Sequence, residues 1–181
     1  MSKLSVCILF GGMSPEHDVS LRSAESVLNN MDPEKYNIFP VGITKEGNWV
    51  LYNSTDYSKL PTGEWLENPD NRRAAISPVR GQGLLSFEGD CVVRERIDVV
   101  FPVLHGTNGE DGAIQGLLQI AGIPIIISTA SPSHRLPFTM KLINRPDNVI
   151  PIRVNNTVFK VLIPVYIFTN SFKSQNYLIS G

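Results

Sequence analysis

The stretch FPVLHGTNGEDGAIQG, residues 101–116, contains the change of pattern that decides the fold. An apolar run over residues 97–104 stops at His105, and a loop with three glycines follows. The pattern then becomes helical over residues 113–121, and Gly122 is typical of a helix C-terminus. A structural loop needs glycine, but it does not need a His, a Glu and an Asp as well. The stretch therefore predicts a strand, a loop with a candidate site, and a short helix.

The N-terminal region has the same order of elements. Residues 4–10 are continuously apolar and end at Gly11-Gly12, which predicts a central strand. Ser14 as N-cap, Pro15 in the first turn and nearby acids predict a helix that runs to about Met31. The residues expected to face its core are Val19, Ala24, Val27, Leu28 and Met31.

Several further strands are expected before residue 128. They lie at residues 36–43, 49–52, 83–87, 91–94 and 123–127. Residues 53–81 are polar and contain scattered Pro and Gly, which predicts a surface excursion with one short helix. This order predicts an α/β fold with a three-layer, doubly wound, mostly parallel sheet over residues 1–126.

Composition limits the class of protein. The chain has 181 residues, 42% hydrophobic, and a net charge of -1, so charge offers no case for nucleic acid or an anionic membrane. Cys7 and Cys91 lie in strand-like runs and are expected to be buried free thiols, which fits a cytoplasmic protein. The apolar N-terminal run is too short for a transmembrane helix and lacks the cleavage site of a signal peptide.

The chain changes character near residue 126. Residues 1–126 carry 10 Lys and Arg against 16 Asp and Glu, a net of -6. Residues 127–181 carry 6 Lys and Arg against one acid, Asp147, a net charge of +5. They contain no glycine before Gly181. We expect either a shift of reading frame, with a poorly folded tail, or a genuine but divergent C-terminal segment.

Two loops, at residues 11–18 and 105–112, each follow the carboxyl end of a predicted strand. In an open α/β sheet such loops lie at one edge and can share a cleft. The first loop offers a helix N-terminus for an anion, or Glu16 for an amine; alternatively, its polar residues only cap the helix. It is neither a Rossmann fingerprint nor a P-loop, so it gives no support for nucleotide binding.

The second loop has its own two interpretations. His105 could hydrogen-bond Glu110, which would fix the imidazole tautomer, while Asp111 caps the next helix. Alternatively, the loop is structural and bonded to itself. A metal site is not expected, because one His and two adjacent acids lack a spaced ligand set. His17 and His134 are expected to face solvent.

These two segments together resemble a known family. LFGGMSPEHDVSLRSA with FPVLHGTNGEDGAIQGLLQIAGIP is similar to the N-terminal domain of the D-alanine–D-alanine ligases, in the ATP-grasp superfamily. Residues 105–116 match H-G-x-x-G-E-D-G-x-I-Q-G, and residues 11–20 match G-G-x-S-x-E-x-x-V-S. The resemblance covers roughly residues 3–126.

The resemblance implies an activity and a site. Such enzymes use ATP and Mg²⁺ to join two D-alanines into a peptidoglycan precursor, in a pathway of cell-wall biogenesis that maintains cell shape. It implies catalytic roles for Glu16, which would hold the first D-alanine's amino group, and Ser20. The substrate-binding residues that it implies are His105, Gly106, Glu110 and Asp111. It also implies a homodimer formed through this domain.

The tail departs from the family pattern. The family continues with Met-Asp-Lys, whereas Thr139-Met140-Lys141 lacks the Asp, and the later ATP and metal residues have no counterpart. We therefore expect this chain to be a truncated ligase that is inactive alone and binds neither ATP nor Mg²⁺ strongly. The alternatives are a non-catalytic D-alanine-binding or dimerisation fragment, or an ATP-grasp relative that uses another acid. The second substrate, D-alanine, D-lactate or D-serine, is left open.

Overall fold

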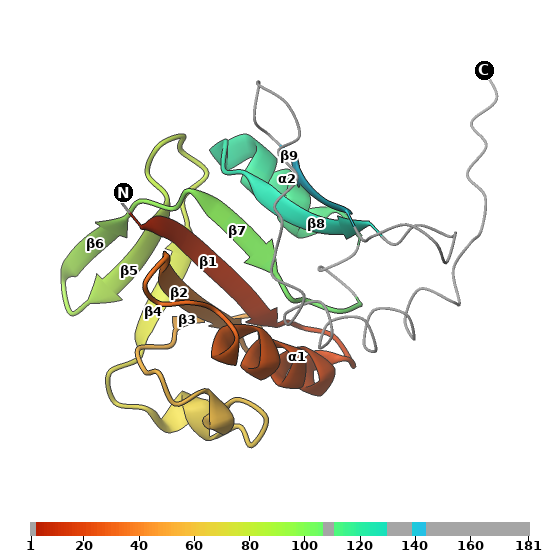
Figure 1. The fold of residues 1–181 in the computed structure, drawn as a ribbon. Coiled ribbons are helices and arrows are strands. Elements are labelled where there is room, and N and C mark those ends of the chain that lie inside the picture. The colour runs from red at the N-terminus through yellow and green to blue at the C-terminus, as the bar shows by residue number, and fades with distance from the viewer. Residues whose placement is uncertain (1–2, 107–110, 130–138, 144–181) are drawn as a thin grey trace.

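A computed structural model describes residues 3–106, 111–129 and 139–143 of the chain (Figure 1). One mixed sheet runs through it, with the strand order β6-β5-β4-β3-β2-β1-β7-β8-β9. Its strands are β1 (Leu4–Gly11), β2 (Tyr36–Ile43), β3 (Trp49–Leu51), β4 (Arg72–Ile76), β5 (Leu84–Glu88), β6 (Cys91–Glu95), β7 (Val99–Pro102), β8 (Ile125–Thr129) and β9 (Thr139–Ile143). The helices are α1 (His17–Asn29), the short 3-10 turns η1 (Tyr57–Lys59) and η2 (Glu64–Glu67), and α2 (Ala113–Ala121).

The centre of the sheet is parallel and its flanks are antiparallel. β1 pairs in parallel with β2 and β7, and β7 pairs in parallel with β8. The pairs β2–β3, β3–β4, β4–β5, β5–β6 and β8–β9 are antiparallel. The predicted α/β fold is confirmed, but the sheet is mixed because hairpins extend the parallel core on both sides.

The two helices cover opposite faces of the sheet. Alternate residues of β1 point to each face, so Ile8 packs on the side of α1 and Leu9 on the side of α2. From α1, Ala24 and Leu28 enter the first core, whereas Leu118 of α2 enters the second. The expected three layers are therefore present. β1 is buried on both faces, which explains its continuous apolar sequence.

Helix α1 begins later and ends earlier than the sequence predicted. Ser14 is not the N-cap, because residues 15 and 16 form a turn and the helix starts at His17. Ala24, Val27 and Leu28 are buried as expected, but Val19 and Met31 are only half-buried. The Ser14 hydroxyl instead accepts a hydrogen bond from Glu16 N at 3.1 Å.

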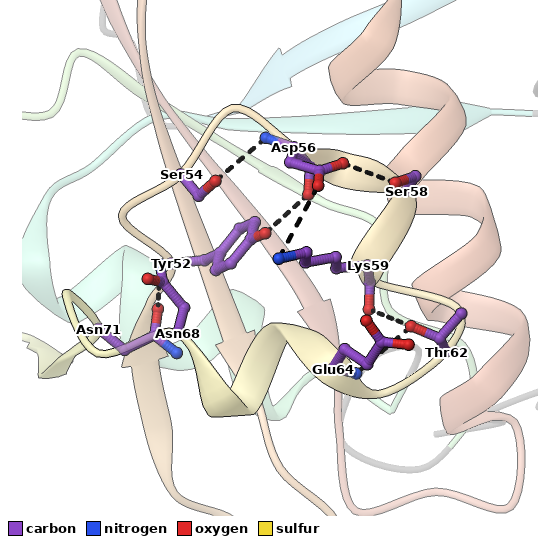
Figure 2. A network of polar contacts seen from close by, with 9 residues as sticks. All are labelled: Tyr52, Ser54, Asp56, Ser58, Lys59, Thr62, Glu64, Asn68 and Asn71. Atoms are coloured by element: carbon purple, nitrogen blue, oxygen red, sulfur yellow. Dashed lines mark hydrogen bonds and ion pairs between the residues drawn. The ribbon is translucent and has the colours of Figure 1, made fainter.

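The segment between β3 and β4 is more ordered than the sequence indicated. Asp56 is the centre of a group of polar contacts at the start of η1, where its carboxylate accepts from Ser58 at 2.6 Å (Figure 2). Thr62 connects η1 to η2, because its hydroxyl donates to Lys59 O at 3.1 Å and accepts from Glu64 N at 3.4 Å. Its apolar residues serve the core: Trp65 and Leu60 are fully buried, and Trp65 packs edge-on against Phe10. Residues 72–76, which we assigned to a surface excursion, form strand β4.

The β5–β6 hairpin and α2 agree with prediction, with one correction. The hairpin turns at residues 88–91, and α2 ends at Gly122 with a φ of 70°. Cys7 is buried as expected, but Cys91 is exposed. Cys91 is the first residue of β6, the edge strand of the sheet, and lies beside the turn of the β5–β6 hairpin.

The start of the tail contributes to the sheet. β9 lies within residues 127–181 and pairs antiparallel with β8, from Ile125 opposite Ile143 to Thr129 opposite Thr139. The predictions that concern residues 144–181 fall outside the described residues. Among the described helices, none combines the length and apolar character needed to cross a membrane.

Candidate functional site

The two loops singled out in the sequence meet beyond the carboxyl ends of β1 and β7. The contact is closest at Gly106, which has a φ of +71°. A Cβ atom there would lie 2.5 Å from Ser14 Oγ and 2.7 Å from the Glu16 carboxylate oxygen Oε2. The topology-based expectation of a common edge is therefore confirmed, and Gly106 is needed for both its backbone conformation and its lack of a side chain.

Ser20 joins the two strands that lead into this site. Its side chain is fully buried in α1, where the hydroxyl accepts from Gly11 N at 2.8 Å and donates to Val103 O. Gly11 ends β1, and Val103 directly follows β7. The observed role of Ser20 is thus to hold the two loops at a fixed separation. Its predicted catalytic role stays a prediction.

His105 is buried against helix α1, with 1% of its surface exposed. Its Nε2 lies 3.3 Å from Ser23 Oγ, on the turn of α1 that follows Ser20. Burial lowers the pKa of His105, and the nearby Glu16 carboxylate partly offsets this effect. The imidazole is therefore mainly neutral at pH 7 and stands beside a carboxylate.

His17 is buried, and the prediction that it faces solvent is wrong. Because α1 starts at residue 17 rather than at Ser14, this side chain turns inward and its Nδ1 lies 2.8 Å from Gly12 O. The same turn is held by Gly12 N, which donates to Ile43 O at 2.8 Å. A side chain at Gly11 would collide with Ile43 O, so Gly11 permits this close approach of β1 and β2.

The remaining predicted site residues divide into two groups. The N-cap of α2 is Gly112, and the Asp111 carboxylate, one residue earlier, accepts a hydrogen bond from Ala113 N at 3.1 Å; its substrate-binding role stays a prediction. Glu110, and with it the predicted His105–Glu110 bond, lies outside the described residues, as does His134. Sequence reasoning missed Ser23, although its spacing of three from Ser20 places both hydroxyls on one helix face.

The contacts at the meeting point of the two loops favour an amine over an anion as a bound ligand. Ser14 accepts from Glu16 N through its hydroxyl and from His17 N through its carbonyl, so two amides at the helix start are already used. Glu16 adds a carboxylate at the same place, which repels anions. No cluster of three potential metal ligands occurs among the described residues. The described site can therefore hold a cation that donates hydrogen bonds.

Comparison with known proteins identifies the family. The family model described as the D-ala D-ala ligase N-terminus matches residues 5–128, which include both loops of the site. The chain belongs to this family. The matched range contains Glu16, Ser20, His105 and Gly106, so the site described above lies within the part of the chain that matches the family model.

Individual relatives support the same assignment. The D-alanine–D-alanine ligase of Thermoanaerobacter sp. strain X514 is 47% identical over 131 residues, which cover 70% of this chain and 34% of that protein. The D-alanine–D-alanine ligase of Rhodococcus erythropolis is 42% identical and covers 78% of this chain and 41% of that protein. Since 78% of 181 residues exceeds 126, this similarity continues beyond residue 126.

Solved structures agree with the fold. The VanG D-Ala:D-Ser ligase from Enterococcus faecalis superposes with a TM-score of 0.63 at 37% identity, covering 68% of this chain and 35% of that one. The D-alanine–D-alanine ligase from Coxiella burnetii gives a TM-score of 0.59 at 32% identity, covering 70% and 36%. The chain thus spans about a third of the length of most of these relatives.

Proposed function

We propose that this chain is the N-terminal domain of an ATP-dependent, cytoplasmic ligase that joins D-alanine to a second D-alanine for peptidoglycan precursor. In this proposal the domain binds the first D-alanine. The observation that carries it is the close approach of Glu16 Oε2 to Gly106, where a Cβ would lie 2.7 Å from it, in a chain of this family. A carboxylate at this edge suits the ammonium group of an amino acid.

The chemistry of the site supports that role. A hydrogen bond from an ammonium to a carboxylate is charge-assisted and contributes about 1.5–3 kcal/mol. Neutral His105 adds no repelling charge, and Gly106 has no Cβ, which would otherwise lie 2.7 Å from the Glu16 carboxylate oxygen. Ser14, Ser20 and Ser23 hold the two loops in place, so orientation is set before the substrate arrives.

We propose further that the chain alone does not catalyse the ligation. The described residues contain no group of three His, Cys, Asp or Glu side chains able to hold Mg²⁺. ATP and Mg²⁺ would therefore bind to parts of the enzyme that correspond to the remaining two thirds of the relatives. The second substrate differs among relatives, since one structural relative is a D-Ala:D-Ser ligase, and we propose that those remaining parts select it.

The alternative is a non-catalytic fragment that binds D-alanine or mediates homodimer formation. The family assignment and the intact site are compatible with both roles. Light scattering of the 181-residue chain separates them: a dimer supports association through this domain, and a monomer that binds D-alanine supports a binding role only.

The deciding experiment is a D-alanine titration of the full chain followed by NMR. We expect Glu16→Gln to weaken binding by about 10- to 100-fold, because it removes the charge but keeps the shape. Asp18→Asn is the matched control, since this exposed carboxylate lies two residues away and pairs with Lys45 at 3.1 Å. Equal D-alanine affinity in Glu16→Gln and wild type would refute the proposal, and ATP-dependent phosphate release by the chain would refute its inactivity.

The tail belongs to the same proposal. We propose that the family pattern is lost within residues 127–181 through a change of reading frame, which their basic charge and their lack of glycine before Gly181 support. The extent of similarity to the Rhodococcus erythropolis relative favours a position for that change later than residue 126. Sequencing the gene and reading it in all three frames tests this proposal. A second frame that encodes the ATP-binding and metal-binding residues of the family would support it. The absence of any such frame would refute it.

A further inference from the structure

Strand β6 forms one edge of the sheet, and its outer side pairs with no other strand of the described residues. On its inner side it pairs with β5, through a hairpin that turns at Gly89 and Asp90. Figure 1 shows this hairpin at the side of the molecule, away from α1 and α2. The unpaired N–H and C=O groups of an edge strand are a template for another extended strand.

The hydrogen-bond pattern shows which backbone groups of β6 point outward. Ser77 N donates to Gly83 O at 3.0 Å, and the bonded pairs of antiparallel strands alternate along the chain. The backbone groups of β5 residues 84, 86 and 88 therefore point to β6, where residues 95, 93 and 91 are their partners. It follows that the N–H and C=O groups of Val92 and Arg94 point to the open edge.

The side chain of Val92 ends a row that crosses three strands. Val92 is opposite Phe87 of β5, and Phe87 is opposite Arg73 of β4. The Arg73 guanidinium lies 5.9 Å from the centre of the Phe87 ring, and this ring is half-buried. Val92 is 54% exposed. The row thus ends with an exposed apolar side chain at the open edge of the sheet.

Two opposite charges flank Val92. Asp90 precedes it and Arg94 follows it; both are exposed, and neither forms an ion pair with another described residue. Two β6 strands can pair antiparallel through their outward groups, with Val93 kept within the paired segment, when they are centred on Val92, Val93 or Arg94. Centring on Val92 sets the two valines together and places each Arg94 opposite Asp90. Centring on Val93 sets Val92 opposite Arg94, and centring on Arg94 sets two arginines together.

We propose that the β6 edge is an interface between two copies of this chain, in which the β6 strands pair antiparallel about Val92 and join the two sheets into one. The Val92 side chains meet at the centre, and an Arg94–Asp90 ion pair on each side fixes the alignment. An arginine on an edge strand ordinarily opposes such pairing, but here Asp90 of the second copy neutralises its charge. The paired segment is short, so the dimer is reversible. This inference goes beyond the proposed function and holds whether or not D-alanine binds.

The first test uses the thiol of Cys91, which is exposed, whereas Cys7 is buried. With the strands centred on Val92, the two copies of Cys91 are diagonal neighbours at about 7–8 Å. Centring on Val93 would separate them by about 14 Å, because each residue adds about 3.4 Å along a strand. A bismaleimide that spans the shorter distance should link the purified full chain into a dimer, and Cys91→Ser should abolish the product.

Two results of this cross-linking would overturn the proposal. Linking by a reagent of the longer span alone would show that the strands are not centred on Val92. No linked dimer at any protein concentration would show that two copies do not pair here, and would favour an extended segment of another protein as the occupant of the edge.

The second test changes the charges at the interface. Arg94→Glu sets two carboxylates against each other on both sides of the dimer, and the cross-linking rate should fall at least about fivefold. Asp90→Lys should have a similar effect, and combining both substitutions should restore the rate, because the charges are then exchanged. Arg22→Glu, at an exposed position of α1, is the matched control and should keep the wild-type rate. An unchanged rate in Arg94→Glu, or no recovery in the double variant, would overturn the proposal.

A D-alanine titration of the same samples separates this inference from the proposed function. Arg94→Glu should bind D-alanine as the wild type does, because the β6 edge takes no part in the proposed binding site. If the wild type binds D-alanine but gives no linked dimer, the interface is refuted and the binding role stands. If it gives the linked dimer but does not bind D-alanine, the binding role is refuted and the interface stands.

Discussion

Replacement of Gly106 by alanine tests the geometry of the site independently of any ligand. Two costs add up. A φ of +71° places an alanine in the left-handed region, which costs about 1–2 kcal/mol. Its Cβ would also lie 2.5 Å from Ser14 Oγ and 2.7 Å from Glu16 Oε2, and relieving such crowding typically costs about 1–3 kcal/mol. We therefore expect the free energy of unfolding to fall by about 2–5 kcal/mol.

Gly63→Ala is the matched control for Gly106→Ala. Gly63 has a φ of +83°, but a Cβ atom there would meet nothing within 4 Å. In this variant the free energy of unfolding should fall only by the backbone contribution of about 1–2 kcal/mol. The difference between the two variants, about 1–3 kcal/mol, then measures the crowding at the site alone.

Urea denaturation monitored by tryptophan fluorescence gives both values, and thermal unfolding checks them at about 4 °C per kcal/mol. D-alanine affinity should fall in Gly106→Ala, because Glu16 is displaced, and stay unchanged in Gly63→Ala. If the two variants unfold with the same free energy within about 0.5 kcal/mol, the two loops do not constrain each other and the reasoning fails.

Three further predictions concern single side chains. Ser20→Ala should cost about 2–4 kcal/mol in urea denaturation, because it leaves a buried N–H and a buried carbonyl without their partner, whereas Ser26→Ala should change stability by less than about 0.5 kcal/mol. One thiol, Cys91, should react at once with a thiol reagent, and Cys7 only on unfolding, because burial raises the pKa of the Cys7 thiol; two fast thiols would contradict this. Burial in the folded chain lowers the pKa of His105 below 6.5, so the unfolded chain binds more protons than the folded chain when the pH drops below 6.5. The free energy of unfolding should therefore fall in a denaturation series from pH 7 to 5. His105→Gln should reduce that fall.

Local pattern predicted the elements that are buried on both faces or closed by a strong stop signal. β1 and β2 agree with the apolar runs that predicted them, and α2 runs from Ala113 to Ala121 with Gly122 as its C-cap, as expected. These elements are decided by short-range effects, namely hydrophobic period and the left-handed residue at the helix end. The meeting of the two loops also followed, because parallel strands direct their carboxyl ends to one edge.

Two of the failures concern residues whose environment comes from distant parts of the chain, and one concerns the start of α1, which lies three residues after the predicted N-cap Ser14. β4 was missed because Arg72 and Arg73 make it polar, and only pairing with β3 and β5 makes it a strand. Cys91 was expected to be buried, but its strand lies at the sheet edge. His17 was expected to be exposed, but the late start of α1 turns it inward to Gly12.

The sequence by itself determined the α/β class, the two loops and the family, because glycines, caps and apolar periods act over a few residues. Only the tertiary structure decided the partners of the site. Ser20 contacts Val103, 83 residues away, and Ser23 contacts His105 across 82. Such partners depend on how α1 packs over β1 and β7, and that packing is the sum of many weak apolar contacts that no single motif encodes.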